Sequence, residues 1–212
     1  MSATGAVVGN GLVSLSTGIN KQDREDLFDC LLRAERVAGQ VSRDEHFTYW
    51  AYRYGKALEQ RSFVKLSPIM HEPMVIRSAS ELEEISFRVI ESRGSARLAR
   101  QAQASLQAMQ IHHYAEHFFE SINGNSVIAG FQVIPCAVDT TGAVMVLLCG
   151  IQMTGHVETR DFDFWSDSRS ELMLRITGGA YRFDRRDYAT HRDAVARELD
   201  AHGSRAIQTF AL

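Results

Sequence analysis

The sequence predicts an α/β fold of the α+β type, in which an antiparallel β-meander is flanked on both faces by helical hairpins. Two observations predict it. Apolar side chains recur at helical spacing over about residues 21–122, and the period then changes to that of neighbouring strands over about 126–184. The segment Val127–Met153 is apolar on both faces of its strands, so helices must cover the sheet twice. The expected architecture is a three-layer α/β/α sandwich.

The first part of the chain predicts a strand followed by two helices. Ala6–Ser16 is short, apolar and interrupted by glycine, which is typical of a strand. Asn20 can cap a helix over Lys21–Ala38. The S-R-D-E motif at 42–45 is a capping box and predicts a second helix that runs to about Gln60. Because the link between the helices is short, they should form an antiparallel hairpin.

The middle of the chain predicts a second pair of helices. Two prolines interrupt Phe63–Ile76, which we expect to be extended or irregular. The S-E-L-E motif at 80–83 opens a helix to about Glu91, and Ala96–Ser121 has the spacing of one long helix. These helices supply the second cover that the sheet requires.

The meander begins with a hairpin. Ser126–Val138 and Ala143–Thr154 are predicted strands on either side of a D-T-T-G connection. If this turn is centred between its two threonines, Cys136 faces Met145 on the partner strand. The cysteines at 136 and 149 are then not cross-strand partners.

The rest of the chain completes the predicted domain. Val157–Trp165 is expected to be a third strand and Glu171–Phe183 a half-exposed strand with a glycine bend. Tyr188–His202 returns to helical spacing and closes the fold. We expect a single domain over 1–212, with helical hairpins at about 21–122, the meander at about 126–184 and a closing helix at about 188–202.

The two-faced hairpin has two interpretations. Leaving an apolar side chain in water forgoes about 1.5–3 kcal/mol, so both faces need a cover and the residues can be a plain buried core. Each strand is also long enough to cross a bilayer when it is tilted, so the sheet can be a surface that is uncovered at a membrane. The candidate membrane-active residues are Phe131, Val133, Ile134, Val144, Val146, Leu148 and Ile151.

Composition excludes several classes of protein. The net charge of −3 gives no basic excess of the kind that nucleic-acid binders carry, so no nucleic-acid partner is expected. Three cysteines do not make a disulfide framework, and we expect them to be reduced and buried. The first residues lack a basic leader and an apolar core, so we expect synthesis in the cytoplasm without a signal peptide, followed by release and action on target membranes.

Two groups of polar residues are candidates for binding. His113 and His117 are four residues apart on a predicted helix and can hold a metal together, although no third ligand is evident and surface or core histidines are the alternative. Arg182, Arg185 and Arg186 can contact anionic lipid head groups or simply be solvated at the start of a helix. No catalytic motif is found, so we expect no enzyme and no cofactor.

The segment T-G-A-V-M at 141–145, followed by C-G at 149–150, resembles a turn and strand of the Cyt-type cytolytic delta-endotoxins, small single-domain insecticidal toxins. The order of elements is similar over most of the chain. The resemblance implies an antiparallel sheet wrapped by helical hairpins, no catalytic residues, and an action in which the helices swing away and the sheet or its oligomer damages the lipid bilayer. The chain departs from this family in a shorter N-terminus, more charged helices and more arginine.

Three functions follow from these observations. The first is a membrane-interacting, pore-forming or lipid-binding cytolytic protein that acts by displacing helices from the two-faced sheet, with a lipid membrane as partner and self-association into a homo-oligomer. The second is a non-enzymatic bacterial virulence or immunity protein whose sheet is only a core. The third is a small metal-binding enzyme built on His113 and His117.

Overall fold

The computed structural model describes residues 3–77, 79–111, 122–123, 126–156, 172–201 and 207–212. The strands in this part of the chain are β1 (Thr4–Val8), β2 (Gly11–Leu15), β3 (Phe63–Met70), β4 (Met74–Ile76), β5 (Ile122–Asn123), β6 (Ser126–Val138), β7 (Val144–His156), β8 (Leu172–Phe183) and β9 (Ile207–Ala211). They form one sheet in the order β3-β8-β7-β6-β2-β1-β9, with β4 beside β8 and β5 beside β6. Neighbouring strands are antiparallel, except for β2 and β6, which form a parallel pair.

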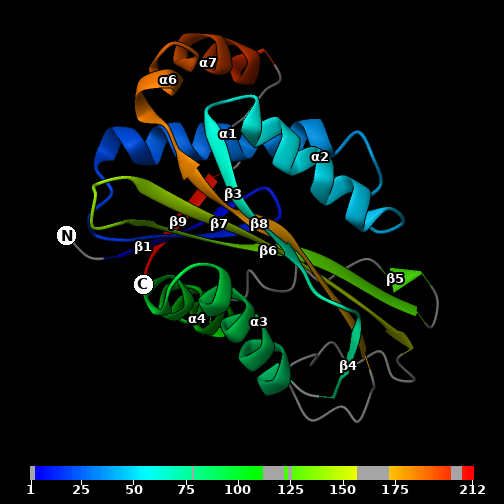
Figure 1. Cartoon of the computed structure of the whole chain (residues 1–212). Coiled ribbons are helices and arrows are strands. Elements are labelled where there is room, and N and C mark those ends of the chain that lie inside the picture. The colour runs from blue at the N-terminus through cyan, green and yellow to red at the C-terminus, as the bar shows by residue number, and fades with distance from the viewer. Residues whose placement is uncertain (1–2, 78, 112–121, 124–125, 157–171, 202–206) are drawn as a thin grey trace.

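Helices cover the sheet on both faces. They are α1 (Lys21–Ala38), α2 (Phe47–Glu59), α3 (Ala79–Arg93), α4 (Ala96–Ile111), α6 (Arg185–Ala189) and α7 (Arg192–Asp200). Helices α1 and α2 lie on one face and α3 and α4 on the other, while α6 and α7 lie outside α1 (Figure 1). The predicted three-layer arrangement is confirmed, and α6–α7 add a further layer on the α1 side. None of the described helices is long and apolar enough to cross a bilayer.

The sheet separates two apolar cores. Because side chains alternate along a strand, Ile134 and Cys136 of β6 pack with α1 and α2, whereas Val133 and Ala137 belong to the core under α3 and α4. The same alternation in β7 sends Leu148 to the first core and Leu147 to the second. The middle of the sheet therefore has no wet face, as its sequence pattern predicts.

The first helix begins where its cap predicts, and the second begins later. The Asn20 side chain accepts a hydrogen bond of 2.8 Å from the backbone N–H of Asp23, which caps α1. The Ser42 hydroxyl does accept from the Glu45 N–H, at 3.3 Å, but this bond closes a separate turn. Helix α2 starts at Phe47, whose ring would lie 3.3 Å from a Cβ at Gly150, so packing on the sheet sets the start.

The β6–β7 connection is one residue longer than predicted. Oδ1 of Asp139 accepts hydrogen bonds from the backbone N–H groups of Thr141 and Ala143, at 2.8 and 2.9 Å, and Gly142 takes a φ of 83°. The turn therefore includes residue 143 and shifts the register. The prediction that Cys136 faces Met145 is wrong, because Cys136 faces Val146.

Other segments differ from the sequence expectation because of distant partners. Ala6–Ser16 is a hairpin of two strands that turns at Gly9, which has a φ of 57°. The expected irregular segment Phe63–Ile76 forms β3 and β4, and Pro68 is tolerated because β3 is the last strand of the sheet on its side. The expected closing helix is divided into α6 and α7, and β9, which was not expected, pairs with β1. The expected strand at Val157–Trp165 and the continuation of α4 beyond Ile111 lie outside the described residues.

Candidate membrane-active sheet

The predicted membrane-active residues are all buried within the protein. Their exposed fractions are 1% or less, apart from 2% at Leu148. Four of them, Ile134, Val144, Val146 and Leu148, belong to the core under α1–α2, and the other three, Phe131, Val133 and Ile151, belong to the core under α3–α4. The sheet is therefore shielded on both faces, and uncovering either face requires a pair of helices to leave.

The α1–α2 cover is held from outside as well as from the sheet. Arg192 donates two hydrogen bonds to the Asp26 carboxylate, at 2.8 and 2.7 Å, so α7 is joined to α1 by a bidentate ion pair. Arg33 Nε lies 2.8 Å from Glu198 Oε2 and forms a second ion pair between the same helices. Asp26 is only 3% exposed. Helix α1 is thus clamped between the sheet and α7.

The α3–α4 cover is held mainly by apolar contact. Leu82 and Ile90 of α3 and Leu98 and Leu106 of α4 are buried against the sheet core. The Gln101 side chain adds a hydrogen bond of 3.3 Å to the Cys136 carbonyl. Among the described residues, Figure 1 places no further helix outside this pair, so displacing it would separate apolar surfaces without breaking the ion pairs of α1.

A group of half-buried polar residues lies between α1 and the sheet. Glu35 accepts a hydrogen bond of 3.1 Å from the Asn10 side chain, and the Asn10 carbonyl accepts one of 3.1 Å from the Gln132 N–H. Arg43 lies against β6, since its Nε would be 3.3 Å from a Cβ at Gly130. Burial raises the pKa of Glu35 above its ordinary value of 4.5, and the nearby Arg43 opposes the rise. A carboxylate here destabilises the fold relative to a neutral acid.

Glu35→Gln should gain stability relative to wild type as the pH rises above about 4.5. In that window the folded wild type keeps a proton that the unfolded chain has released, so its free energy of unfolding falls as the pH approaches the raised pKa of Glu35. Glutamine carries no such proton. Urea denaturation at several pH values should show the variant-minus-wild-type difference rising with pH. A difference that is the same at every pH would contradict this, and Glu25→Gln, an exposed glutamate of α1, is the control.

The three cysteines are reduced and buried, as predicted. Cys30 and Cys136 lie in the α1–α2 core and Cys149 lies in the α3–α4 core. Burial raises the pKa of Cys149 to about 12 and that of the other two thiols further. Thiols of this kind are poor nucleophiles at neutral pH, so they are inert in the folded protein.

The other candidate residues are not brought together into one site. Arg185 Nε lies 2.9 Å from the Asp23 carboxylate and helps to fix α6 to α1. Arg182 and Arg186 are exposed, on β8 and α6, and their contact with lipid stays a prediction. His113 and His117 lie outside the described residues, and within those residues no group of three or more His, Cys, Asp or Glu is arranged to hold a metal.

Comparisons with known proteins find similar folds. No protein-family model matches the sequence, and no curated protein matches it. A delta-endotoxin structure aligns over 82% of this chain and 80% of its own, with 12% identity and a TM-score of 0.50. The activated Cyt2Ba monomer from Bacillus thuringiensis subsp. israelensis aligns over 84% and 98%, with 11% identity and a TM-score of 0.49. The Evf virulence factor aligns over 91% and 78%, with 14% identity and a TM-score of 0.39.

The fold resembles that of a delta-endotoxin. The resemblance to delta-endotoxins that the T-G-A-V-M segment indicates is therefore confirmed at the level of the fold. At 12% identity it concerns the arrangement of helices and strands.

Sequence reasoning missed an exposed apolar surface next to α2. Tyr49 and Tyr52 stack with their ring centroids 6.3 Å apart, and they are 55% and 59% exposed. Lys56 Nζ lies 5.9 Å from the Tyr52 ring. The spacing of these three residues puts them on one side of α2, opposite its buried stripe, and this second stripe was the signal that could have revealed them.

Proposed function

We propose that the protein binds and damages lipid bilayers, with the two-faced sheet as its membrane-active surface. The observation that carries the proposal is the burial of both faces of β6 and β7 over residues 131–137 and 146–153, in strands that are each thirteen residues long. About 9–11 residues of tilted strand span a hydrocarbon core, so these strands are long enough. In water each face needs a cover of helices, whereas in hydrocarbon neither face does.

We infer that α3–α4 is the cover that leaves. Its apolar contacts with the sheet can be exchanged for apolar contacts with lipid tails at little cost, because the core and the bilayer are both apolar. The α1–α2 cover would also have to break the Asp26–Arg192 and Arg33–Glu198 ion pairs or carry α7 with it. Loss of α3–α4 would expose Phe131, Val133 and Ile151 as one continuous surface.

Release of a trapped dye from phospholipid vesicles tests the proposal. Wild-type protein should release the dye in proportion to the protein-to-lipid ratio, because each uncovered sheet adds apolar surface to the bilayer. Circular dichroism before mixing would show that the protein added is folded. If folded protein releases no dye at any ratio and any lipid composition, the proposal is wrong, and capture of a specific protein partner would then favour an interaction protein.

A further inference from the structure

A hollow of about 210 Å³ lies beside the start of α2. It is lined by the first turn of α2, by the end of β3 with the connection that follows, and by β8. Arg175 and Thr177 of β8 face it, whereas the intervening Ile176 is 3% exposed and belongs to the α3–α4 core. The hollow is therefore on the α1–α2 side of the sheet. Its lining residues are Phe47, Thr48, Met70, His71, Pro73, Arg175, Ile176 and Thr177.

The polar part of the hollow suits an anion. Arg175 is exposed, and its Nη1 donates one long hydrogen bond of 3.5 Å to Gln152 Oε1. The described lining residues include no carboxylate, while Thr48, Thr177 and His71 offer hydroxyl and imidazole groups. A guanidinium presents paired N–H donors that match two oxygens of a phosphate. Within the described part of the chain, most of the donors of Arg175 are available for such a ligand.

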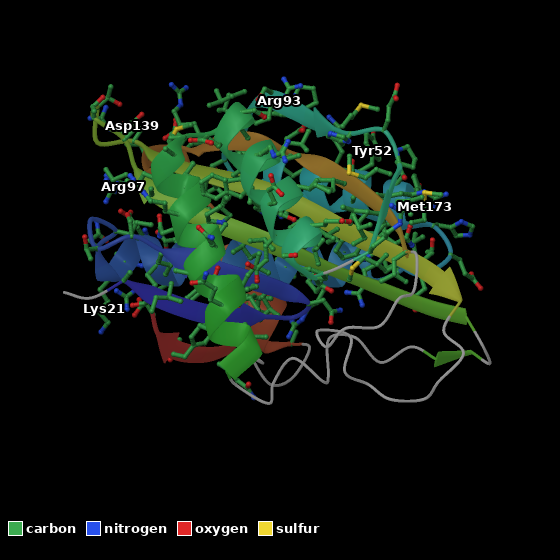
Figure 2. The ribbon with its side chains drawn as sticks, turned by 90° about the horizontal axis from the view of Figure 1, so that it is seen from below. Lys21, Tyr52, Arg93, Arg97, Asp139 and Met173 are labelled. Carbon is green, nitrogen blue, oxygen red and sulfur yellow. The ribbon has the colours of Figure 1, made fainter. Side chains whose placement is uncertain are left out.

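The rim of the hollow, which consists of Met70 in its lining and of Val75 and Met173 on the neighbouring parts of β4 and β8, is apolar and exposed. Met70 is 78% exposed and lies opposite Thr177 in the sheet. Val75 and Met173 face each other on β4 and β8 and are 50% and 37% exposed. Figure 2 places Met173 toward the same end of the molecule as Tyr52, away from Arg97. Exposed apolar side chains gathered in one place, unlike scattered ones, mark an interaction surface.

We propose that this hollow binds the phosphate of a phospholipid head group while its rim contacts the interfacial layer of the bilayer. The combination favours a phospholipid. A free phosphate ester would leave the exposed methionines without a contact, and a purely apolar ligand would leave Arg175 without one. Tyrosine rings are suited to the boundary between head groups and tails. The proposal deepens the proposed function and rests on it for the source of the lipid. It assigns the first contact with a membrane to the α2 side, before any helix leaves.

Vesicle binding by Arg175→Ala tests the site. The experiment compares wild type, Arg175→Ala and Arg175→Lys. Each protein is sedimented with phosphatidylcholine–phosphatidylglycerol vesicles and, separately, with phosphate-free galactolipid vesicles. Each protein is also titrated with glycerophosphate. Arg175→Ala should bind the phospholipid vesicles about tenfold more weakly, which corresponds to about 1.4 kcal/mol. Arg175→Lys should recover part of the affinity, because it restores the charge and not the paired donors. Binding to galactolipid should be equal for all three proteins.

Arg97→Ala is the matched control. Arg97 is an exposed arginine of α4, and its loss should leave phospholipid binding unchanged. Equal binding by wild type and Arg175→Ala, or an equal loss in Arg97→Ala, would overturn the site. Glycerophosphate binding as strong as that of vesicles would reassign it to soluble phosphate esters and also overturn the proposal. Arg175-dependent binding without dye release would support the site and refute membrane damage. Dye release that is unchanged in Arg175→Ala would support membrane damage and refute the site.

Discussion

Vesicle leakage should stop when α3–α4 is tied to the sheet by a disulfide, and it should return on reduction. Gly94 lies between α3 and α4, and a Cβ at this position would be 3.2 Å from Cδ1 of Leu147 on β7. Cβ of Leu147 is two bonds from this Cδ1, so the Cβ atoms of cysteines at 94 and 147 would lie at most about 6 Å apart, and a small shift of the α3–α4 connection brings them into the range of a disulfide. The bond would hold the cover on the core that contains Phe131 and Ile151. Because the oxidised and reduced proteins have one sequence, any loss of packing from Leu147→Cys affects both alike.

A second disulfide provides the matched comparison. Gly18 precedes α1, and a Cβ there would be 3.6 Å from Cβ of Val138 at the end of β6, which is within the usual range for a disulfide. Oxidised Gly18→Cys/Val138→Cys should leak like its reduced form, because it restrains the start of α1. Blockage by this bond and not by the first would assign the movement to the α1 side. Full leakage with both bonds closed would remove helix displacement from the mechanism.

Arg192→Ala should destabilise the protein more than Asp26→Asn. Removing Arg192 leaves the buried Asp26 carboxylate without its cation, which costs about 2–3 kcal/mol, because Asp26 keeps one hydrogen bond from Gln22. Removing the charge of Asp26 leaves Arg192, which is 37% exposed and can be solvated, so the cost is about 1 kcal/mol. Urea denaturation gives both free energies of unfolding.

The double variant separates this cause from a loss of packing. If Arg192→Ala acts through the unpaired carboxylate, adding Asp26→Asn should make the protein more stable than Arg192→Ala alone. Simple addition of the two single costs would contradict that cause. The exposed pair of Lys21 and Glu25 on α1 is the control, and its removal should change stability by less than about 0.5 kcal/mol.

The central part of the fold could be predicted because its signals are local. Apolar residues on both faces of Val127–Met153 require two covers, whatever the rest of the chain does. Asn20 caps α1 through a bond that spans three residues, so the sequence contains the whole interaction. The burial of the seven candidate membrane-active residues could be predicted for the same reason, although their action on membranes stays a prediction.

The parts that were wrong depend on partners far along the chain. Strand β9 has five residues and no pattern of its own, and it exists because β1 offers an edge. Strand β3 contains Pro68, and a proline predicts a break in a strand when only the neighbouring residues are considered. An edge strand tolerates it, because one side of the strand has no neighbour that would need an N–H donor. The start of α2 depends on Phe47 meeting Gly150. The hollow beside Arg175 combines three separate segments, so no single window of sequence contains it.

The pairing of β1 with β9 has a consequence for how the molecule reaches its native state. Thr4 lies opposite Ala211, so this ladder closes a loop of almost the entire chain. Contacts between residues so distant in sequence form late and slowly, because a large loss of chain entropy precedes any gain from the new bonds. Until they form, β1 presents an open edge that invites association with other strands. Refolding should therefore have a slow final phase, and the yield should fall as the protein concentration rises.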